Sequence, residues 1–318
     1  MKRSHNQSLP FTRNEYQGRL QKVHNQLDKE NLDAILISRP ANINWLTGFD
    51  AWSFYTPQAM IVEIGSSPIW LGREMDASSA KLSSVLEPEQ LVSWPEELVQ
   101  HPTRHPGDYI GMSLANLGFN KKRIGYEKDS DFLSPRMIEA IKTKLPNTKW
   151  FDADLMINWL RFVKTRDEIK YMRQAAQIAG LAMDAAIEGL SIGERQCNIM
   201  ARVVAAQIKG TPEFGGDMTA LHPLILAGEN ASAAHPLWTD EVIKNQNAVA
   251  FELGGCRKRY NVGLARSTYL GKPPKKILDV AKVVQEGMEV VLSAMRPNVE
   301  AASVHQAWQS ILDRYKLE

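Results

Sequence analysis

The chain has 318 residues, which is long enough for two ordinary domains that each have a hydrophobic core. A hydrophobic fraction of 44% and a charged fraction of 23% are typical of a globular protein in water. The 38 basic and 36 acidic residues leave a net charge of +2, which argues against a nucleic-acid-binding protein.

Neither a membrane helix nor a secretion signal is predicted. No apolar run reaches the roughly 18 residues that a membrane helix requires, and the basic N-terminus lacks the apolar centre of a signal peptide. The two cysteines, Cys197 and Cys256, are typical of free thiols in a reducing compartment. We therefore expect a cytoplasmic protein with no membrane partner.

The first half of the chain alternates between strand and helix patterns. The expected strands are 33–38, 59–64, 68–72 and 123–128, and the expected helices are 13–31, 75–86 and 134–146. Ser134 and Pro135 are typical of a helix start. The passage 39–58 is expected to be rich in loops. This alternation predicts an α/β domain over residues 1–160.

The second half, residues 161–318, has a different pattern. The expected helices are 161–189, 191–209, 274–295 and 301–316, and the expected strands are 223–228, 248–255 and 261–270. We expect Gly254 and Gly255 to turn the chain between the last two strands. The pattern predicts helices packed on an antiparallel sheet, with a linker near 155–165.

A polar loop after the strand 223–228 presents Asn230 and His235. An unperturbed histidine titrates near pH 6.5, so His235 is suited to general acid and base catalysis. A loop histidine that only completes a hydrogen bond fits the same pattern.

Glu252 ends the apolar run AVAF, where a carboxylate is expected to be partly buried. A buried carboxylate is unfavourable unless it meets a cation or hydrogen-bond donors. Glu252 fits two roles: a structural ion pair with Arg257, Arg259 or Arg266, or contact with a cationic substrate or an electrophilic carbon.

Five aromatic residues gather in the passage 39–58: Trp45, Phe49, Trp52, Phe54 and Tyr55. Aromatic residues in such a passage are most often domain core or interface. Trp52 and Tyr55 are also candidates to hold a cationic ligand on their ring faces.

The sequence contains no recognisable cofactor motif. No phosphate-binding glycine motif follows a strand, and the histidines outside the loop at 235 have no metal-ligand spacing. We expect a protein without a cofactor.

Four segments carry a family resemblance: ANINWLTGF (41–49), RFVKTRDEIKYMRQAAQIA (161–179), LILAGENASAAHP (224–236) and FELGGCRKRYNVGLARS (251–267). They resemble, in the expected order, the pita-bread superfamily of Xaa-Pro aminopeptidases, prolidases, methionine aminopeptidases and creatinase. The resemblance implies an α/β N-terminal creatinase-like domain and an α+β pita-bread C-terminal domain.

The last segment departs from the peptidase pattern, which reads roughly D-x-G-x-x-x-x-x-Y-x-x-D-x-T-R. In this alignment Glu252 takes the place of the first metal aspartate, and Gly263 takes the place of the second. Glycine offers no ligand atom, so the resemblance implies no normal two-metal site.

The pattern resembles the metal-free branch that contains creatinase, and within it the ectoine hydrolases, which open a cyclic amidine to an N-acetylated diaminobutyrate. The resemblance implies that Glu252 binds the amidinium, attacks its carbon or orients a water molecule, and that His235 transfers protons. It also implies a homodimer whose active site is shared, with Trp52 and Tyr55 closing the pocket. The remaining implied substrate-binding residues are Asn230, Tyr260 and Arg266.

Three other functions remain open: a guanidine hydrolase like creatinase, an Xaa-Pro metallopeptidase, and a pita-bread module that only binds a protein. The family's catalytic domain is expected to continue beyond the residue where this chain ends. We therefore expect a C-terminally truncated form with low activity and poor solubility.

Overall fold

The computed structural model describes residues 9–317 and consists of two compact units, with the division in the sequence between Ile169 and Lys170. This division falls inside helix α7 (Arg166–Gly189). Within the described range, no helix is both long enough and apolar enough to cross a membrane.

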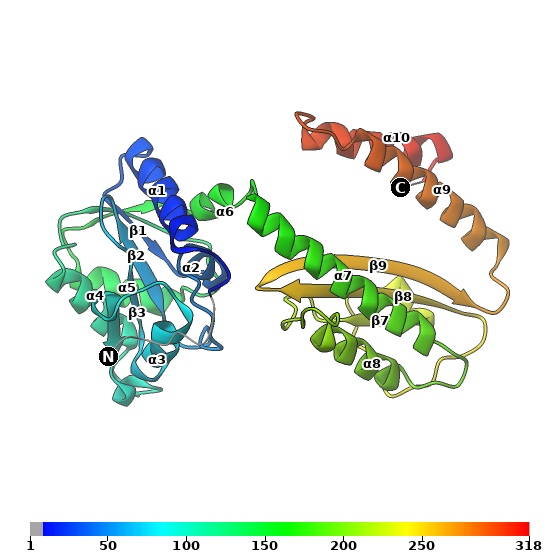
Figure 1. Cartoon of the computed structure of the whole chain (residues 1–318), viewed down its shortest axis with the longest axis horizontal. Helices are drawn as coiled ribbons and strands as arrows, with labels where there is room; N and C mark the ends of the chain where they lie inside the picture. The colour runs from blue at the N-terminus through cyan, green and yellow to red at the C-terminus, as the bar shows by residue number, and fades with distance from the viewer. Residues whose placement is uncertain (1–8, 318) are drawn as a thin grey trace. The chain divides into compact units, whose positions relative to one another are not determined.

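The first unit is built on a mixed six-stranded sheet in the order β4-β3-β2-β1-β5-β6 (Figure 1). The strands are β1 (Ala34–Ile37), β2 (Ala59–Glu63), β3 (Ile69–Arg73), β4 (Leu91–Trp94), β5 (Arg123–Tyr126) and β6 (Lys149–Asp152). The helices are α1 (Arg13–Lys29), α2 (Pro40–Thr47), α3 (Glu74–Ser83), α4 (Pro106–Asn116), α5 (Pro135–Lys144) and α6 (Met156–Leu160), with short 3-10 turns η1 (Pro88–Gln90) and η2 (Glu96–Leu98).

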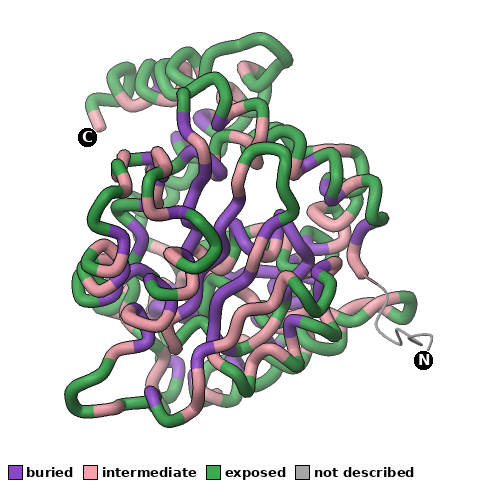
Figure 2. The backbone as a smooth tube through the Cα atoms, turned by 90° about the vertical axis from the view of Figure 1, so that its left-hand side faces the viewer, coloured by how far each residue is buried: buried purple, intermediate pink, exposed green. Residues whose placement is uncertain are grey.

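Strand β1 is buried on both faces because helices cover both sides of the sheet. Ile35 and Ile37 pack in a core with α1 and α2, whereas Ala34 and Leu36 pack in a second core with α4 and α5. The two-sided burial explains why β1 is apolar at every position instead of alternating. Figure 2 shows the buried stretches of the chain in purple.

The strands predicted at 33–38, 59–64, 68–72 and 123–128 are confirmed as β1, β2, β3 and β5. The prediction of loops through 39–58 is wrong for its first part, because α2 forms there. Pro40 in the first turn of α2 and Gly48 after its last residue, with φ of 81°, are typical boundary signals.

The N-terminus of α2 is capped by a residue from a distant part of the chain. Its N-cap residue makes no side-chain cap. The buried carboxylate of Glu127, which follows β5, accepts hydrogen bonds from the backbone N–H groups of Ser38 and Arg39, both at 2.7 Å. The first N–H groups of a helix lack partners within it and carry partial positive charge, so this carboxylate stabilises α2.

The second unit is a three-stranded antiparallel sheet in the order β7-β8-β9 (Figure 1). The strands are β7 (Leu224–Ala227), β8 (Asn247–Arg257) and β9 (Tyr260–Leu270). The other elements are α7, α8 (Gln196–Lys209), the 3-10 turn η3 (Gly228–Ser232), α9 (Lys275–Ala294) and α10 (Ala301–Tyr315). Helices α7 and α8 share a core with the sheet through Met183, Ile199 and Phe251.

The prediction that Gly254 and Gly255 form the turn of the hairpin is wrong. Strand β8 runs through both glycines, which pair with Gly263 and Val262 of β9. The turn is made instead by the two residues 258 and 259, whose φ angles are 51° and 66°. This left-handed pair is the usual geometry of a two-residue hairpin turn.

Gly255 is required for a different reason. A Cβ atom at this position would lie 2.1 Å from the carbonyl oxygen of Ala175 and 2.4 Å from the backbone nitrogen of Ala179. Both contacts belong to α7, so the backbone of this helix lies directly against the backbone of β8. A glycine inside a strand is typical of such a close approach.

Helix α4 also lies in a part of the chain for which no helix was predicted. His105 is its N-cap residue, and the Nδ1 atom accepts a hydrogen bond from the Gly107 N–H at 3.0 Å. Burial lowers the pKa of His105 below its ordinary value, Arg136 lowers it further, and Asp108 opposes both. The neutral ring is therefore the form that the folded unit favours.

Replacing Gly255 by alanine is expected to destabilise the second unit by about 3 kcal/mol, because neither backbone can move away easily. Gly254→Ala is the matched control, since the nearest atom to a Cβ there is 3.4 Å away. Urea unfolding of the full chain, followed by circular dichroism, measures both variants. Equal loss of stability in the two variants would contradict the close contact with α7.

Acid is expected to weaken the cap of α4. Because the pKa of His105 is lower in the folded chain, its contribution to stability is complete above the unfolded pKa of about 6.5 and is lost as the pH falls through the folded value. Thermal unfolding at pH 7.5 and 5.5 should show a smaller pH effect in His105→Asn than in the unmodified chain, since asparagine caps without titrating. An identical pH effect in both chains would refute the assignment.

Candidate active site

The β8–β9 hairpin has two chemically different faces. Side chains alternate between the faces of a strand, and directly paired residues share a face. The register pairs Glu252 with Ala265, and Gly254 with Gly263. Phe251 lies on the opposite face, where it is buried in the core shared with α7 and α8. Glu252 therefore lies on the face turned away from these helices, where its neighbours on β9 have little or no side chain and Leu224 of β7 is paired with it.

The Glu252 carboxylate is partly buried and forms no ion pair or hydrogen bond within residues 9–317. Arg257 donates to the carbonyl oxygen of Gly215 at 3.1 Å, and Arg266 donates to that of Ala265 at 2.7 Å. The structural ion pair considered for Glu252 is therefore not observed. A partly buried carboxylate without a protein partner is available to a cationic ligand.

Tyr260 and Arg266 are not brought together with Glu252. Arg266 pairs with Phe251 in the ladder, so both residues lie on the helix-packed face. Tyr260 pairs with Arg257 and so lies on the same face as Arg266. Its ring stacks on that of Tyr171 of α7, with 6.0 Å between the centroids. The substrate-binding role predicted for Tyr260 and Arg266 remains a prediction.

Asn230 and His235 lie in the polar loop after β7, as the sequence suggested, and both are exposed. Strand β7 pairs Leu224 with Glu252 and ends at Ala227, which pairs with Val249 of β8. The loop that carries His235 therefore begins about 10 Å along the sheet from Glu252. His235 has a left-handed backbone with φ of 62°. This conformation costs a non-glycine residue of order 1 kcal/mol and is frequent in functional loops.

The five aromatic residues of 45–55 separate into two groups in the first unit. Trp45 and Phe49 are buried in its core. Trp52 and Tyr55 are each 64% exposed, and the ring of Trp52 packs edge-on against Phe54 at 4.8 Å. Trp52 and Tyr55 are therefore available to a ligand or to another protein.

The segment 217–221 lies over the glycine pair of the hairpin and was not identified from the sequence. The side chain of Asp217 accepts a hydrogen bond from the Lys258 N–H in the hairpin turn. At its other end, the Ala220 N–H donates to Oδ1 of Asn261 at 3.0 Å. The Asp217 N–H also donates to the carbonyl oxygen of Cys256 at 3.0 Å. Three hydrogen bonds thus join the segment to the hairpin, although it has no secondary structure or motif that would reveal this.

The described residues do not fit a two-metal site on this face. Besides Glu252, the positions that face the site on β9 are Asn261, Gly263 and Ala265, and none of them is a carboxylate. Across residues 9–317, no three His, Cys, Asp or Glu side chains gather as metal ligands. We therefore derive no catalytic step through a metal ion.

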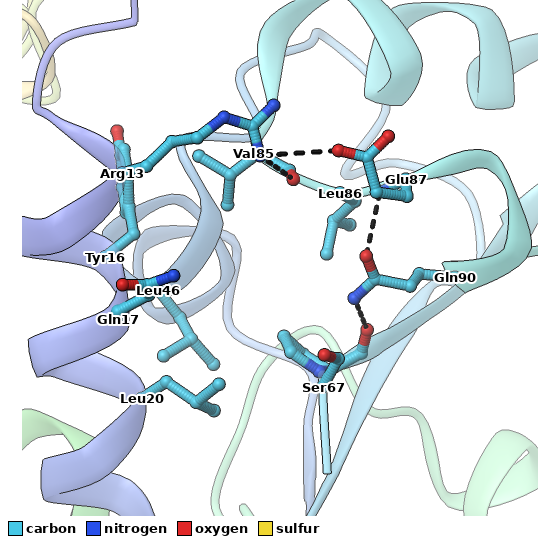
Figure 3. Close-up of a pocket in the computed structure, with 11 residues that line it drawn as sticks. Arg13, Tyr16, Gln17, Leu20, Leu46, Ser67, Val85, Leu86, Glu87 and Gln90 are labelled. Atoms are coloured by element: carbon cyan, nitrogen blue, oxygen red, sulfur yellow. Dashed lines mark hydrogen bonds and ion pairs between the residues drawn. The ribbon is translucent and has the colours of Figure 1, made fainter.

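A pocket of about 210 Å³ lies in the first unit and contains none of the predicted site residues. Figure 3 shows Arg13 paired with Glu87 at its rim, while Gln90 bonds to the backbone of Glu87 and of Pro68. Because these polar groups satisfy one another, the pocket offers a ligand little specific recognition.

Comparisons with known proteins agree with the two units. Residues 19–163 match the Creatinase/Prolidase N-terminal domain, and residues 170–318 match metallopeptidase family M24. The chain is 36% identical over 311 residues to an uncharacterized hydrolase/peptidase of Sinorhizobium fredii. It is 33% identical over 314 residues to the ectoine hydrolase of Halomonas elongata.

These alignments cover 98% and 97% of this chain, respectively, and 79% of each relative. The solved structure of a prolidase from Thermococcus sibiricus has a TM-score of 0.80 at 19% identity, over 95% of this chain and 78% of that one. The predicted fold, a creatinase-like domain followed by a pita-bread domain, is confirmed. The matches do not establish the predicted truncation.

Removing the Asp217 carboxylate is expected to loosen the segment 217–221. A hydrogen bond to a charged acceptor contributes about 2 kcal/mol, so in Asp217→Ala the Lys258 amide should exchange with solvent at least about tenfold faster. Glu213→Ala, at an exposed position nearby, is the control. Unchanged exchange at Lys258 would show that the segment is not held by this contact.

Proposed function

Because the chain belongs to the family that joins a Creatinase/Prolidase N-terminal domain to a metallopeptidase family M24 domain, we propose that it is a hydrolase that opens a cyclic amidine, such as ectoine, without a metal ion. The relatives support a hydrolase of this family. The identity of 33% to an ectoine hydrolase supports the narrower proposal.

The observation that carries the proposal is the single carboxylate on the open face of the hairpin. Glu252 has no cationic partner within residues 9–317, and its neighbours across the ladder, Leu224 and Ala265, are apolar. An amidinium is planar and carries one positive charge. It would supply the missing charge and N–H donors.

The proposed reaction adds water to the amidine carbon. Glu252 binds the cation and orients the water molecule beside the electrophilic carbon, or adds to the carbon itself and is later displaced by water. In either route His235 takes up the proton that the attacking water loses. The tetrahedral intermediate then loses one ring nitrogen, which takes up a proton from His235 as the C–N bond breaks. The other nitrogen keeps the carbon as an amide, so ectoine would yield an N-acetylated diaminobutyrate.

The remaining predicted contacts complete this proposal. Asn230 lies in the same loop as His235 and would bind the substrate's polar groups. Trp52 and Tyr55 expose the aromatic faces that a cation prefers. We propose that they act in a homodimer, closing the site of the partner copy.

Ectoine incubated with the chelator-treated chain is expected to give N-acetyldiaminobutyrate, detected by NMR. Glu252→Gln and His235→Ala should each lower the rate at least about 100-fold, because each removes a group that acts on the reacting atoms. His222→Ala is the comparison, since this other exposed histidine of the unit stacks on Trp238 and has no assigned role.

Three results would overturn the proposal. They are no ring opening, a requirement for added Mn²⁺ or Zn²⁺, and cleavage of an Xaa-Pro dipeptide in preference to ectoine. Loss of activity in His222→Ala instead of His235→Ala would overturn the assignment of the proton-transfer residue alone.

A further inference from the structure

The face of the hairpin beside Glu252 is bare, and Thr219 and Leu221 of the segment 217–221 lie over the bare area, with Cβ of Thr219 3.6 Å from a Cβ built on Gly254. Gly254 and Gly263 pair across the ladder, so this part of the face has no Cβ atoms. A Cβ on Gly254 would lie 3.4 Å from Cβ of Leu221, and a Cβ on Gly263 would lie 4.0 Å from Cδ2 of the same leucine. Leu221 therefore lies over the glycine pair.

This position places an apolar wall next to the candidate catalytic carboxylate. Residues two apart on a strand share a face and are separated by about 7 Å, so Gly254 is the immediate neighbour of Glu252 on that face. Leu221 is 38% exposed, and its uncovered part is available to a ligand.

The wall is fixed in place by the contacts of its own segment. Asp217 and Ala220 bond to the hairpin, and the Thr219 hydroxyl donates to the carbonyl oxygen of Leu221 at 2.7 Å. These contacts fix the backbone that carries Leu221, so the position of this side chain limits the size of a group that binds beside it.

We propose that Leu221 is a specificity-determining residue that limits the substituent on the amidine carbon to a small apolar group. The inference rests on the proposed function, in which Glu252 binds an amidinium. The acetyl group of the expected product means that the amidine carbon of ectoine carries a methyl group. This methyl group is the part of the substrate that Leu221 would contact.

The chemistry of the wall supports this choice of substituent. A leucine side chain offers no hydrogen bond to a hydroxyl or amino substituent, which would lose its water there. A fixed apolar pocket discriminates against one additional methylene by roughly 10-fold to 200-fold. Glu252 and Leu221 together thus suit a cation with a short alkyl group.

Equilibrium binding tests the inference independently of turnover. Acetamidinium and butyramidinium, which differ by two methylene groups, are titrated into the full chain, and their dissociation constants are measured by NMR. The unmodified chain should prefer acetamidinium. Leu221→Ala should shift the ratio toward butyramidinium by about tenfold, and Leu221→Phe should shift it the other way.

Leu181→Ala is the matched control, because this leucine of α7 is 39% exposed, similar to Leu221. It should leave the ratio unchanged, whereas Glu252→Gln should abolish binding of both cations. An unchanged ratio in both Leu221 variants, or no binding of either cation to the unmodified chain, overturns the inference. Selective binding that depends on Leu221 without opening of ectoine supports the inference and overturns the proposed function.

Discussion

The direct contact between α7 and β8 at Gly255 is the constraint on which the candidate site depends. The helix backbone approaches so closely that no Cβ fits at this position. On the α8 side, Nε2 of Gln207 donates to the carbonyl oxygen of Gly254 at 2.7 Å in a buried hydrogen bond. Because α7 and α8 cover one face of the sheet, Glu252 is left on the other face, where it is partly exposed.

The same scaffold is compatible with the different chemistry that we propose for this member of a family with metallopeptidases. A hairpin face is a regular array of positions, so its chemistry changes with the side chains while the fold stays the same. Here the face presents one carboxylate, a pair of glycines and a leucine contributed by the segment 217–221. These groups are the ones on which the proposed binding of an organic cation rests.

The positions of strands were predicted more reliably than the roles of particular glycines or the presence of helix α2. The apolar runs of β1, β2 and β8 identify strands because burial alone makes them apolar. Gly254 and Gly255 were misassigned to a turn because a turn and a close approach both require glycine, and only the packed helix distinguishes them. Helix α2 was missed although Pro40 and Gly48 are local signals of its ends. Its cap, Glu127, lies 88 positions along the chain from Arg39 and is not visible in the local sequence.

The sequence by itself determined the two-part organisation, most strands and the candidate pair of Glu252 and His235, because periodicity and residue chemistry are local properties. Only the tertiary structure decided which side chains share a face with Glu252. Strand register places Tyr260 and Arg266 on the opposite face from Glu252, although all three belong to the segment 251–267 that resembles the peptidase motif. It also placed Leu221 over the site, because hydrogen bonds between distant residues position that segment and no local pattern encodes them.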